Sequence, residues 1–471
     1  MASEDLAYLP LVEAAARIRA GEVTSRELTE TALERAHRLE PDLNAFVTLM
    51  DEDALAAAEA ADRRRVAGGQ LPPLLGVPIS LKDLYDTAGV RTTAGARIYT
   101  DRVPQRDSTV AARLKAAGAV VFGKNNMLEF AYGEVHPDFG PSHNPWNLDH
   151  STGGSSSGSG ASVAAGVGYG SMGSDTGGSI RQPANWCGLV GLKPTYGRVS
   201  RAGVVPLSWS LDHCGPMTRT VADCAAMLAA VAGHDPADPG SADRPVDDYG
   251  AALGGSLRGV RIARLVDEAR AAVPAMEQAT REALAAMAAA GAMVQEIAWP
   301  DLDDGSVALM AILYAEASSF HEEWIRTRPG DYAPATRERL EMGLRMPAID
   351  YLRAQRVRSG VGRRYAELLA RFDLLVSPTS RSPAPAMRAG AIAATDAPPP
   401  GADRLLGAIG WTGIFDLTGL PAVSVPSGWT TAGLPLGVQV VGRPFAEAEI
   451  LRASAFVEAA AGVVGRRPAL R

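Results

Sequence analysis

A glycine- and serine-rich segment, residues 151–179, carries side chains of this sequence that could do nucleophilic chemistry. It reads STGGSSSGSGASVAAGVGYGSMGSDTGGS and contains one charged residue, Asp175. A serine hydroxyl becomes a strong nucleophile only when a base takes its proton, and glycines leave backbone N–H groups open to a reacting atom. The apolar Val163 and Met172 have no use in a solvated linker. We therefore interpret the segment as backbone that comes close to a ligand.

Two other chemistries each match only a short run, one within this segment and one before it. The run GSSSG has the G-x-S-x-G spacing of a nucleophile elbow at Ser156, which needs a buried strand before it and a histidine after it. The preceding HNPWNLDHST is polar, and the last histidine, His321, lies 150 residues from the C-terminus. The run GAVVFGKN has phosphate-loop spacing, but Asn125 stands where a serine or threonine must bind magnesium. The remaining chemistry pairs serines with a lysine.

Longer runs in and around the segment read GVPISLKD, GKNNMLEFAYG, GGSSSGSGASVAAG, GSDTGGSIRQPANWCGLVGLKPTYGRVSRAGVVP and FDLTGLPAVSVPSG. Taken in this order, they resemble the amidase signature family. The match is dense over residues 70–225 and again over 414–446, and it is thin between them. So long a serial match is far more specific than a lone G-x-S-x-G.

The resemblance implies a serine–serine–lysine active site. The nucleophile falls on Ser179 in DTGGSIRQP, the bridging serine on Ser155, and the lysine on Lys82 in ISLKD. The peptide bond before Ser155 is implied to be cis. The oxyanion hole is implied to consist of backbone N–H groups, which belong to Thr176, Gly177, Gly178 and Ser179.

The same resemblance gives supporting roles to four more residues. Ser156, Asp175 and Arg181 flank the catalytic positions, where hydrogen bonds from such neighbours orient the serines. Tyr132, in EFAYG, lies where the family has a side chain in the pocket wall, so we expect it to contact the acyl part of the substrate.

Lys82 can act as the base only in its neutral form. Lowering its pKa from the reference value of about 10.4 to about 7.5 requires roughly 4 kcal/mol, which burial and nearby polar groups can supply. The apolar run LLGVPISL in front of Lys82 favours such burial.

The resulting hypothesis is a cytoplasmic amidase that acts alone on a soluble carboxamide, with esters, anilides and carbamates open to the same chemistry. The alternative is the A subunit of a tRNA-dependent amidotransferase, which releases ammonia from glutamine. The run LLGAIGWTGI is apolar where an acidic group would be expected to hold the amino end of glutamine, and this favours the enzyme that acts alone. A third hypothesis, a catalytically inactive binding or scaffold homologue, predicts loss of Lys82, Ser155 or Ser179, and all three are present.

The strands and helices that must position Lys82, Ser155 and Ser179 are indicated by alternating strand and helix patterns in the sequence. Capping-box spacing from Thr24 to Glu27 and helical periodicity predict a helix over 24–39, with another over 51–66. Short apolar runs predict strands, including an antiparallel pair at 422–428 and 436–442. We expect one large α/β domain with a mixed, mostly parallel central sheet covered by helices on both faces. Its parts are a helical layer at 1–66 packed on the core and an amidase signature domain at 67–465, with a variable, substrate-shaping region at 230–410.

The composition and charge of the chain limit the classes of partner that we expect it to bind. A formal net charge of −7 offers no broad field for nucleic acid, and no run is apolar and long enough for a membrane span. The start MASEDLAYLP lacks the layout of a secretory signal, and three cysteines fit a reducing compartment. His136, His143 and His150 recur every seven residues, but the prolines between them preclude a shared helix face, so neither a metal nor a cofactor is expected. A homodimer is expected only from the general frequency of such assemblies.

Overall fold

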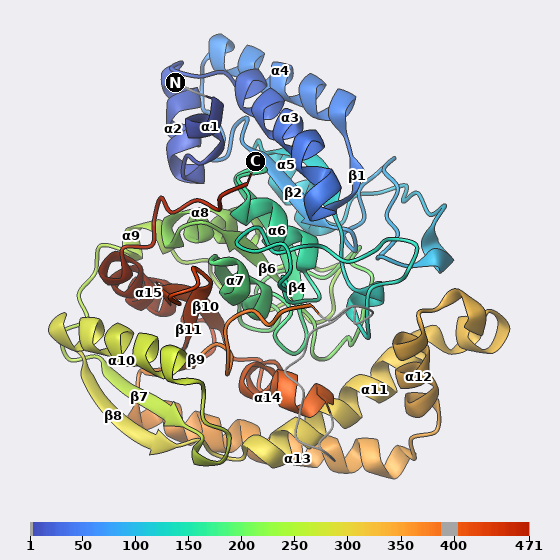
Figure 1. Ribbon diagram of the computed structural model, residues 1–471, viewed down its shortest axis with the longest axis vertical. Helices are drawn as coiled ribbons and strands as arrows, with labels where there is room; N and C mark the ends of the chain where they lie inside the picture. Colours follow the sequence, from blue (N-terminus) through green and yellow to red (C-terminus); the bar gives the residue numbers. More distant parts are fainter. Residues whose placement is uncertain (1–2, 388–403, 471) are drawn as a thin grey trace.

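In the described part of the chain, one 11-stranded sheet carries helices on both faces (Figure 1). The structure is a computed structural model, and it describes residues 3–387 and 404–470. The order of the strands across the sheet is β1-β3-β2-β4-β6-β5-β10-β11-β9-β7-β8. Their bounds are β1 (Phe46–Leu49), β2 (Pro78–Lys82), β3 (Val120–Asn125), β4 (Gly170–Asp175), β5 (Val190–Lys193), β6 (His213–Thr218), β7 (Arg261–Val266), β8 (Met293–Ala298), β9 (Leu374–Pro378), β10 (Ala422–Trp429) and β11 (Pro435–Val441).

The α-helices fill the connections between these strands and cover the sheet. Their bounds are α1 (Ser3–Ala7), α2 (Leu11–Ala20), α3 (Ser25–Leu43), α4 (Asp51–Ala67), α5 (Thr109–Ala116), α6 (Ser157–Ala164), α7 (Arg181–Cys187), α8 (Val221–Val231), α9 (Tyr249–Ala252), α10 (Pro274–Ala289), α11 (Leu302–Thr327), α12 (Pro334–Leu344), α13 (Ala348–Arg371), α14 (Arg404–Leu417) and α15 (Glu447–Ala461).

The predicted mixed α/β sheet is confirmed, but the predicted majority of parallel strand pairs is wrong. Of the ten neighbouring pairs that the structure describes, four are parallel, namely β2–β3, β2–β4, β7–β8 and β7–β9. In the middle of the sheet the chain passes from β5 to β6 and from β10 to β11 without an intervening α-helix, and both of these pairs are antiparallel. The antiparallel pairing of β10 with β11 is confirmed.

The antiparallel middle also includes strands that the sequence pattern does not indicate. β4 reads GSMGSD and β6 reads HCGPMT, and neither has the apolar run of a buried strand although every residue in both is buried. Small residues are needed here because other groups pack close to the backbone. A Cβ atom on Gly173 would lie 2.9 Å from the Ser156 hydroxyl oxygen and 3.0 Å from Ile180.

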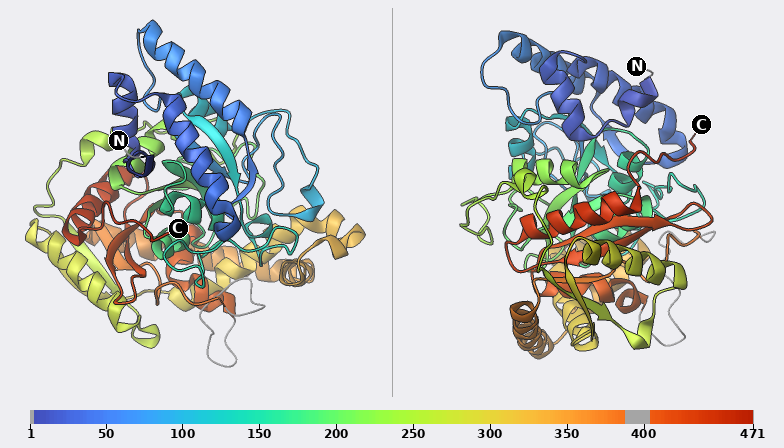
Figure 2. Two further views of the ribbon diagram at one scale, coloured as in Figure 1. Left: turned by 45° about the horizontal axis from the view of Figure 1, so that its top comes forward. Right: turned by 90° about the vertical axis from the view of Figure 1, so that its left-hand side faces the viewer.

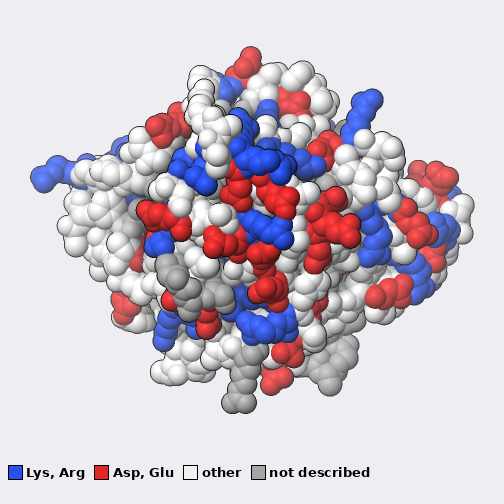
Figure 3. Space-filling model, turned by 90° about the horizontal axis from the view of Figure 1, so that it is seen from above, with Lys and Arg blue, Asp and Glu red and all other residues white. Residues whose placement is uncertain are grey.

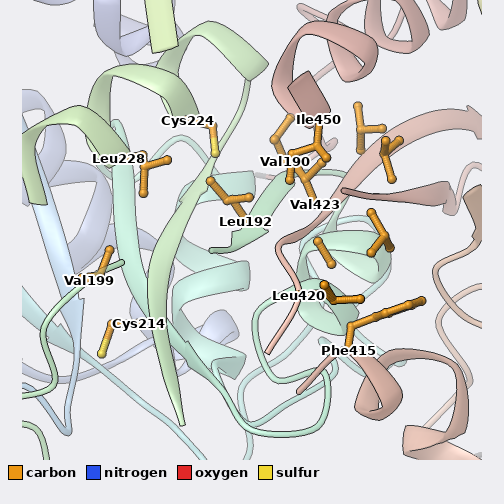
Figure 4. Close-up of a cluster of buried hydrophobic side chains, with 14 of the residues drawn as sticks. Val190, Leu192, Val199, Cys214, Cys224, Leu228, Phe415, Leu420, Val423 and Ile450 are labelled. Atoms are coloured by element: carbon orange, nitrogen blue, oxygen red, sulfur yellow. The ribbon is translucent and has the colours of Figure 1, made fainter. Parts of the chain in front are cut away.

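The two faces of the middle strands are covered by different helices. On one face, Val190 and Leu192 of β5 and Val423 of β10 pack with Ile450 of α15 (Figure 4). On the other face, α7 packs so close to β5 that a Cβ atom on Gly191 would lie 2.5 Å from the Cβ atom of Ala184. Helix α7 directly follows the turn that contains Ser179, so this close packing fixes the position of that turn.

The first four helices lie together at one end of the molecule (Figures 1 and 2). The predicted helix over 24–39 is confirmed as α3, with the capping box of Thr24 and Glu27 in place. Residues 1–66 also contain β1, which pairs with β3 at the sheet edge, so this part is not purely helical. The domain boundary at residue 66 and the substrate-shaping role of 230–410 remain predictions. Over the face that carries these helices, acidic and basic side chains are interspersed (Figure 3).

Candidate active site

Lys82 is the last residue of β2, which pairs with the parallel strand β4. Its Nζ donates to the hydroxyl oxygen of Ser155 at 2.6 Å and to that of Ser174 at 2.9 Å. The lysine is fully buried, and Ser155 is 1% exposed. The structure therefore brings the predicted base and the predicted bridging serine into direct contact.

Burial lowers the pKa of Lys82 from its usual value to about 7, although the negative charge of Asp175 opposes this change. Both groups to which its nitrogen donates are hydroxyls rather than carboxylates, and Asp175 itself pairs with Arg181. A substantial fraction of the lysine is therefore neutral near pH 7. In that form its lone pair can accept a proton from Ser155, as the sequence argument requires.

Ser155, the predicted bridging serine, lies two residues before the first residue of α6. The peptide bond between Gly154 and Ser155 is cis, which confirms the expectation from the family resemblance. The backbone N–H of Ser156 donates to the carbonyl oxygen of Ser179 at 3.3 Å, so the two serine segments are adjacent. Within residues 3–387 and 404–470 no hydrogen bond joins the hydroxyls of Ser155 and Ser179. Ser179 is only half-buried, which leaves it accessible to a substrate.

The carboxylate of Asp175 organises the turn that presents Ser179. It accepts the backbone N–H groups of Gly178 at 2.5 Å, Ile180 at 3.1 Å and Arg181 at 3.3 Å. The predicted oxyanion role of Gly178 therefore needs correction, since its N–H points at Asp175 and is not open to a substrate.

The other predicted oxyanion donors remain open. Within the described parts of the chain, the backbone N–H groups of Thr176, Gly177 and Ser179 donate to no protein acceptor. Glycine at position 177 also leaves its N–H unobstructed by a side chain. The turn thus keeps three candidate donors next to the accessible hydroxyl of Ser179.

Arg181 holds Asp175 in place. Its guanidinium contacts Asp175 through two hydrogen bonds of 3.0 Å and reaches Asp416 of α14 at 2.6 Å, and all three side chains are fully buried. Burial alone would raise the pKa of the Asp175 carboxyl, but the charge and hydrogen bonds of Arg181 lower it below its usual value. Asp175 is therefore a permanent acceptor, as its predicted orienting role requires.

Asp212 is a site residue that the sequence argument does not single out. Its carboxylate accepts the hydroxyl of Thr176 at 2.6 Å and the backbone N–H groups of Leu207 and Ser208. Burial raises the pKa of Asp212 to about 6. Asp212 and Ser174 also line a cavity of about 530 Å³, whose other walls are largely apolar. Neither an apolar pattern nor charge density marks these positions, so only their place in the fold reveals them.

Tyr132 lies in a loop with unusual backbone. Phe130 and Ala131 before it have φ values of 50° and 57°, a left-handed conformation that side chains other than glycine rarely adopt. Tyr132 is 4% exposed, and its ring meets that of Tyr314 edge-on at 6.3 Å between centroids. Its contact with a substrate remains a prediction.

A second buried lysine, Lys193, has a different environment. Burial lowers its pKa to about 7 as well. Its Nζ, however, donates to the carbonyl oxygens of Leu420 at 2.6 Å and Pro194 at 3.2 Å, and to no serine in the described part of the chain. The pKa alone would not separate the two lysines, and the contact with Ser155 identifies Lys82 as the candidate base.

In the described residues no group of three His, Cys, Asp or Glu side chains is arranged to hold a metal ion. No helix in that part of the chain is long and apolar enough to cross a membrane. The three cysteines are unpaired and buried.

The family model for Amidase matches residues 27–451 of the chain. A relative from Geobacter metallireducens, the A subunit of glutamyl-tRNA(Gln) amidotransferase, is 40% identical over 473 residues, which cover 94% of this chain and 96% of the relative.

Two solved structures extend the comparison. The first comes from a study of a vestigial protein complex and the evolutionary origins of an s-triazine catabolic enzyme. It has a TM-score of 0.89 and 36% identity, and the match covers 96% of this chain and 98% of that one. The second is a bacterial aryl acylamidase of the amidase signature family, with a TM-score of 0.89, 26% identity and coverage of 98% and 99%.

Proposed function

Because the chain belongs to the Amidase family, we propose that it cleaves the carbon–nitrogen bond of a carboxamide through an acyl-enzyme on Ser179. One observation carries the proposal: Lys82 is buried, has a pKa of about 7 and lies 2.6 Å from the Ser155 hydroxyl. This contact supplies the base that a serine nucleophile needs.

The first half of the reaction forms the acyl-enzyme. Neutral Lys82 accepts the proton of the Ser155 hydroxyl while Ser155 takes the proton of Ser179. The oxygen of Ser179 attacks the amide carbon, and the tetrahedral intermediate collapses as the carbon–nitrogen bond breaks. The proton returns through Ser155 to the leaving nitrogen, which departs as ammonia or an amine.

The second half restores the enzyme. Water attacks the ester carbon while its proton passes through Ser155 to Lys82. The proton then returns through Ser155 to the oxygen of Ser179 as the bond between that oxygen and the acyl carbon breaks, which releases a carboxylic acid and leaves Lys82 neutral. In both halves the negative oxygen is stabilised by the open N–H groups of the Ser179 turn, and the loss of one such donor costs about 10² to 10³ in rate.

Glutamine is the carboxamide that the comparisons favour. Relatives about 40% identical over nearly the whole chain are named as the A subunit of glutamyl-tRNA(Gln) amidotransferase. This favours the amidotransferase alternative over the sequence-based preference for an amidase that acts alone. Our first candidate function is therefore a protein that releases ammonia from glutamine and works with partner proteins.

An amidase that acts alone on another carboxamide is the second candidate, favoured by one specific observation. Residues 405–414, LLGAIGWTGI, contain no acidic residue that could pair with the amino group of glutamine. In addition, the structure of the aryl acylamidase and that of the vestigial complex have the same TM-score with this chain, 0.89.

The two candidates are separated by measuring ammonia or amine release from the purified chain with glutamine, an aliphatic amide, an anilide and a carbamate. The first candidate predicts negligible release by the chain alone and glutaminase activity once partner proteins from the same organism are added. Unaided turnover of a simple amide or anilide would establish the second candidate instead. Under either candidate Ser179→Ala abolishes the reaction.

A further inference from the structure

Helix α14 contacts the turn of Ser179 through Thr412, a residue more than 230 positions away in the sequence. The Thr412 hydroxyl donates to the carbonyl oxygen of Gly177 at 2.6 Å, and the carbonyl oxygen of Thr412 accepts from Arg181 at 2.9 Å. Asp416, one helical turn later on the same face of α14, contacts Arg181 as well. Thr412 is 4% exposed, so water does not compete for these contacts.

The peptide group between Gly177 and Gly178 is consequently held on both sides. Its carbonyl oxygen is bound by the Thr412 hydroxyl, and its N–H is bound by the carboxylate of Asp175 at 2.5 Å. An ionised carboxylate can only accept a hydrogen bond, so a flipped peptide would place its carbonyl oxygen against another acceptor. Thr412 and Asp175 together therefore select one orientation.

The same orientation is fixed by packing. Gly178 has a φ of 130°, and a Cβ atom there would lie 2.3 Å from the Thr412 hydroxyl oxygen and 3.0 Å from its Cβ atom. The threonine side chain thus rests directly on the glycine backbone. Two adjacent glycines could otherwise adopt several backbone conformations at little steric cost, which would scatter the neighbouring N–H groups.

We propose that Thr412 is a positioning residue for the reaction: its hydroxyl fixes the Gly177–Gly178 peptide, and so aims the Ser179 oxygen and the open N–H groups of Gly177 and Ser179. The inference rests on the proposed role of Ser179 as nucleophile. Misaligned donors reduce the stabilisation of the tetrahedral state more than they reduce the binding of the substrate. The loss of Thr412 should therefore slow the chemical step rather than weaken binding.

The test compares three single variants by the rate at which a fluorophosphonate labels Ser179, followed by intact mass. The phosphonyl adduct is tetrahedral and needs no knowledge of the substrate. Thr412→Val keeps the shape and removes the hydroxyl, and it is expected to lower the saturating labelling rate at least about tenfold with little change in the half-saturating concentration. Thr412→Ser keeps the hydroxyl and should stay within about threefold of wild type.

Thr418→Val is the matched control. The Thr418 hydroxyl donates to the carbonyl oxygen of Ile414 at 2.8 Å, just past the end of the same helix and away from the turn. This variant should label within about twofold of wild type. If Thr412→Val loses its folded near-UV spectrum, the smaller Thr412→Ala replaces it and carries the same expectation.

The inference is overturned if a folded Thr412 variant without the hydroxyl labels at the wild-type rate, or if Thr412→Ser is as slow as Thr412→Val. Ser179→Ala separates this failure from failure of the proposed function. An absence of label on Ser179→Ala, combined with wild-type labelling of Thr412→Val, refutes the role of Thr412 alone. An unchanged label on Ser179→Ala refutes the nucleophile and with it both proposals.

Discussion

The nitrogen of Lys82 lies 2.6 Å from the hydroxyl oxygen of Ser155 in a part of the protein from which solvent is excluded. A lysine at the end of a strand ordinarily reaches water and keeps its charge. Here β2 is buried along its whole length, and burial brings the pKa of the lysine to about 7. Burial of β2 thus lowers the pKa of the proposed base and places its nitrogen against Ser155.

The reaction should speed up as pH rises through about 7. In the proposed mechanism the neutral form of Lys82 is the active one, and the fraction of this form grows tenfold per pH unit well below the pKa and levels off above it. The fluorophosphonate labelling rate of Ser179, measured between about pH 5.5 and 9, should follow this curve. Lys193→Met should leave the midpoint in place, because Lys193 donates to backbone carbonyls rather than to a catalytic serine. A flat or falling profile would contradict the role of Lys82.

Lys82→Met and Ser155→Ala should each slow labelling of Ser179 by about 10³ or more, since either change breaks the proton path. The two residues act as a unit, so the double variant should be no slower than the slower single variant. The three labelling rates, measured side by side on folded protein, check this. Losses that multiply in the double variant would mean that the lysine and the serine act independently.

Arg181→Met should destabilise the fold strongly. It leaves the fully buried carboxylates of Asp175 and Asp416 without their cation, and breaking such a buried arrangement costs about 3–5 kcal/mol. Arg261→Met is the control, because Arg261 pairs with Asp373 at 2.9 Å with 43% of its side chain exposed. The control should leave the unfolding free energy measured in urea close to that of the wild type, because solvent screens an exposed ion pair. Equal losses in the two variants would refute the structural role of Arg181.

Gly178→Ala should abolish labelling of Ser179, because the new Cβ atom would lie 2.3 Å from the Thr412 hydroxyl oxygen. Gly68→Ala is the matched control. Gly68 also has a positive φ, 75°, but a Cβ atom added there would have no other atom within 4 Å. Gly68→Ala introduces only the cost of a positive φ for alanine, about 1–3 kcal/mol, without a steric clash. Ser179 of this variant should therefore be labelled at the normal rate. Normal labelling by Gly178→Ala would show that the turn tolerates movement toward α14.

Local patterns predict the local parts of this fold well. The Thr24–Glu27 spacing predicts the start of α3, and the apolar runs on either side of a short turn predict the β10–β11 hairpin. The glycine-rich β4 is missed because its residues are small for packing reasons that arise only in the fold, where Ser156 and Ile180, the residues just before α6 and α7, lie against Gly173. The expected majority of parallel strand pairs is wrong because β4, β5 and β6, which the sequence pattern does not indicate, form much of the antiparallel middle of the sheet.

In the candidate site, too, the sequence predicts some residues and only the fold reveals others. The family resemblance predicts Lys82 and Ser155, and the structure brings them together. The contacts of Asp416 and Thr412 with the segment around Ser179 cross more than 230 residues of sequence. Asp416 lies in the run FDLTGLPAVSVPSG, which carries the family resemblance, but the sequence assigns no role to either residue. The engagement of the Gly178 N–H by Asp175 depends on the geometry of a single turn, which residue types alone do not determine.

The most direct test of the account is the position of the covalent adduct after the wild-type protein reacts with a fluorophosphonate, mapped by peptide mass and repeated on Ser179→Ala. We predict one adduct, on Ser179, and neither adduct nor turnover above a few per cent of wild type in the variant. An adduct on Ser156, or a Ser179→Ala protein that retains its turnover, would contradict the central claim.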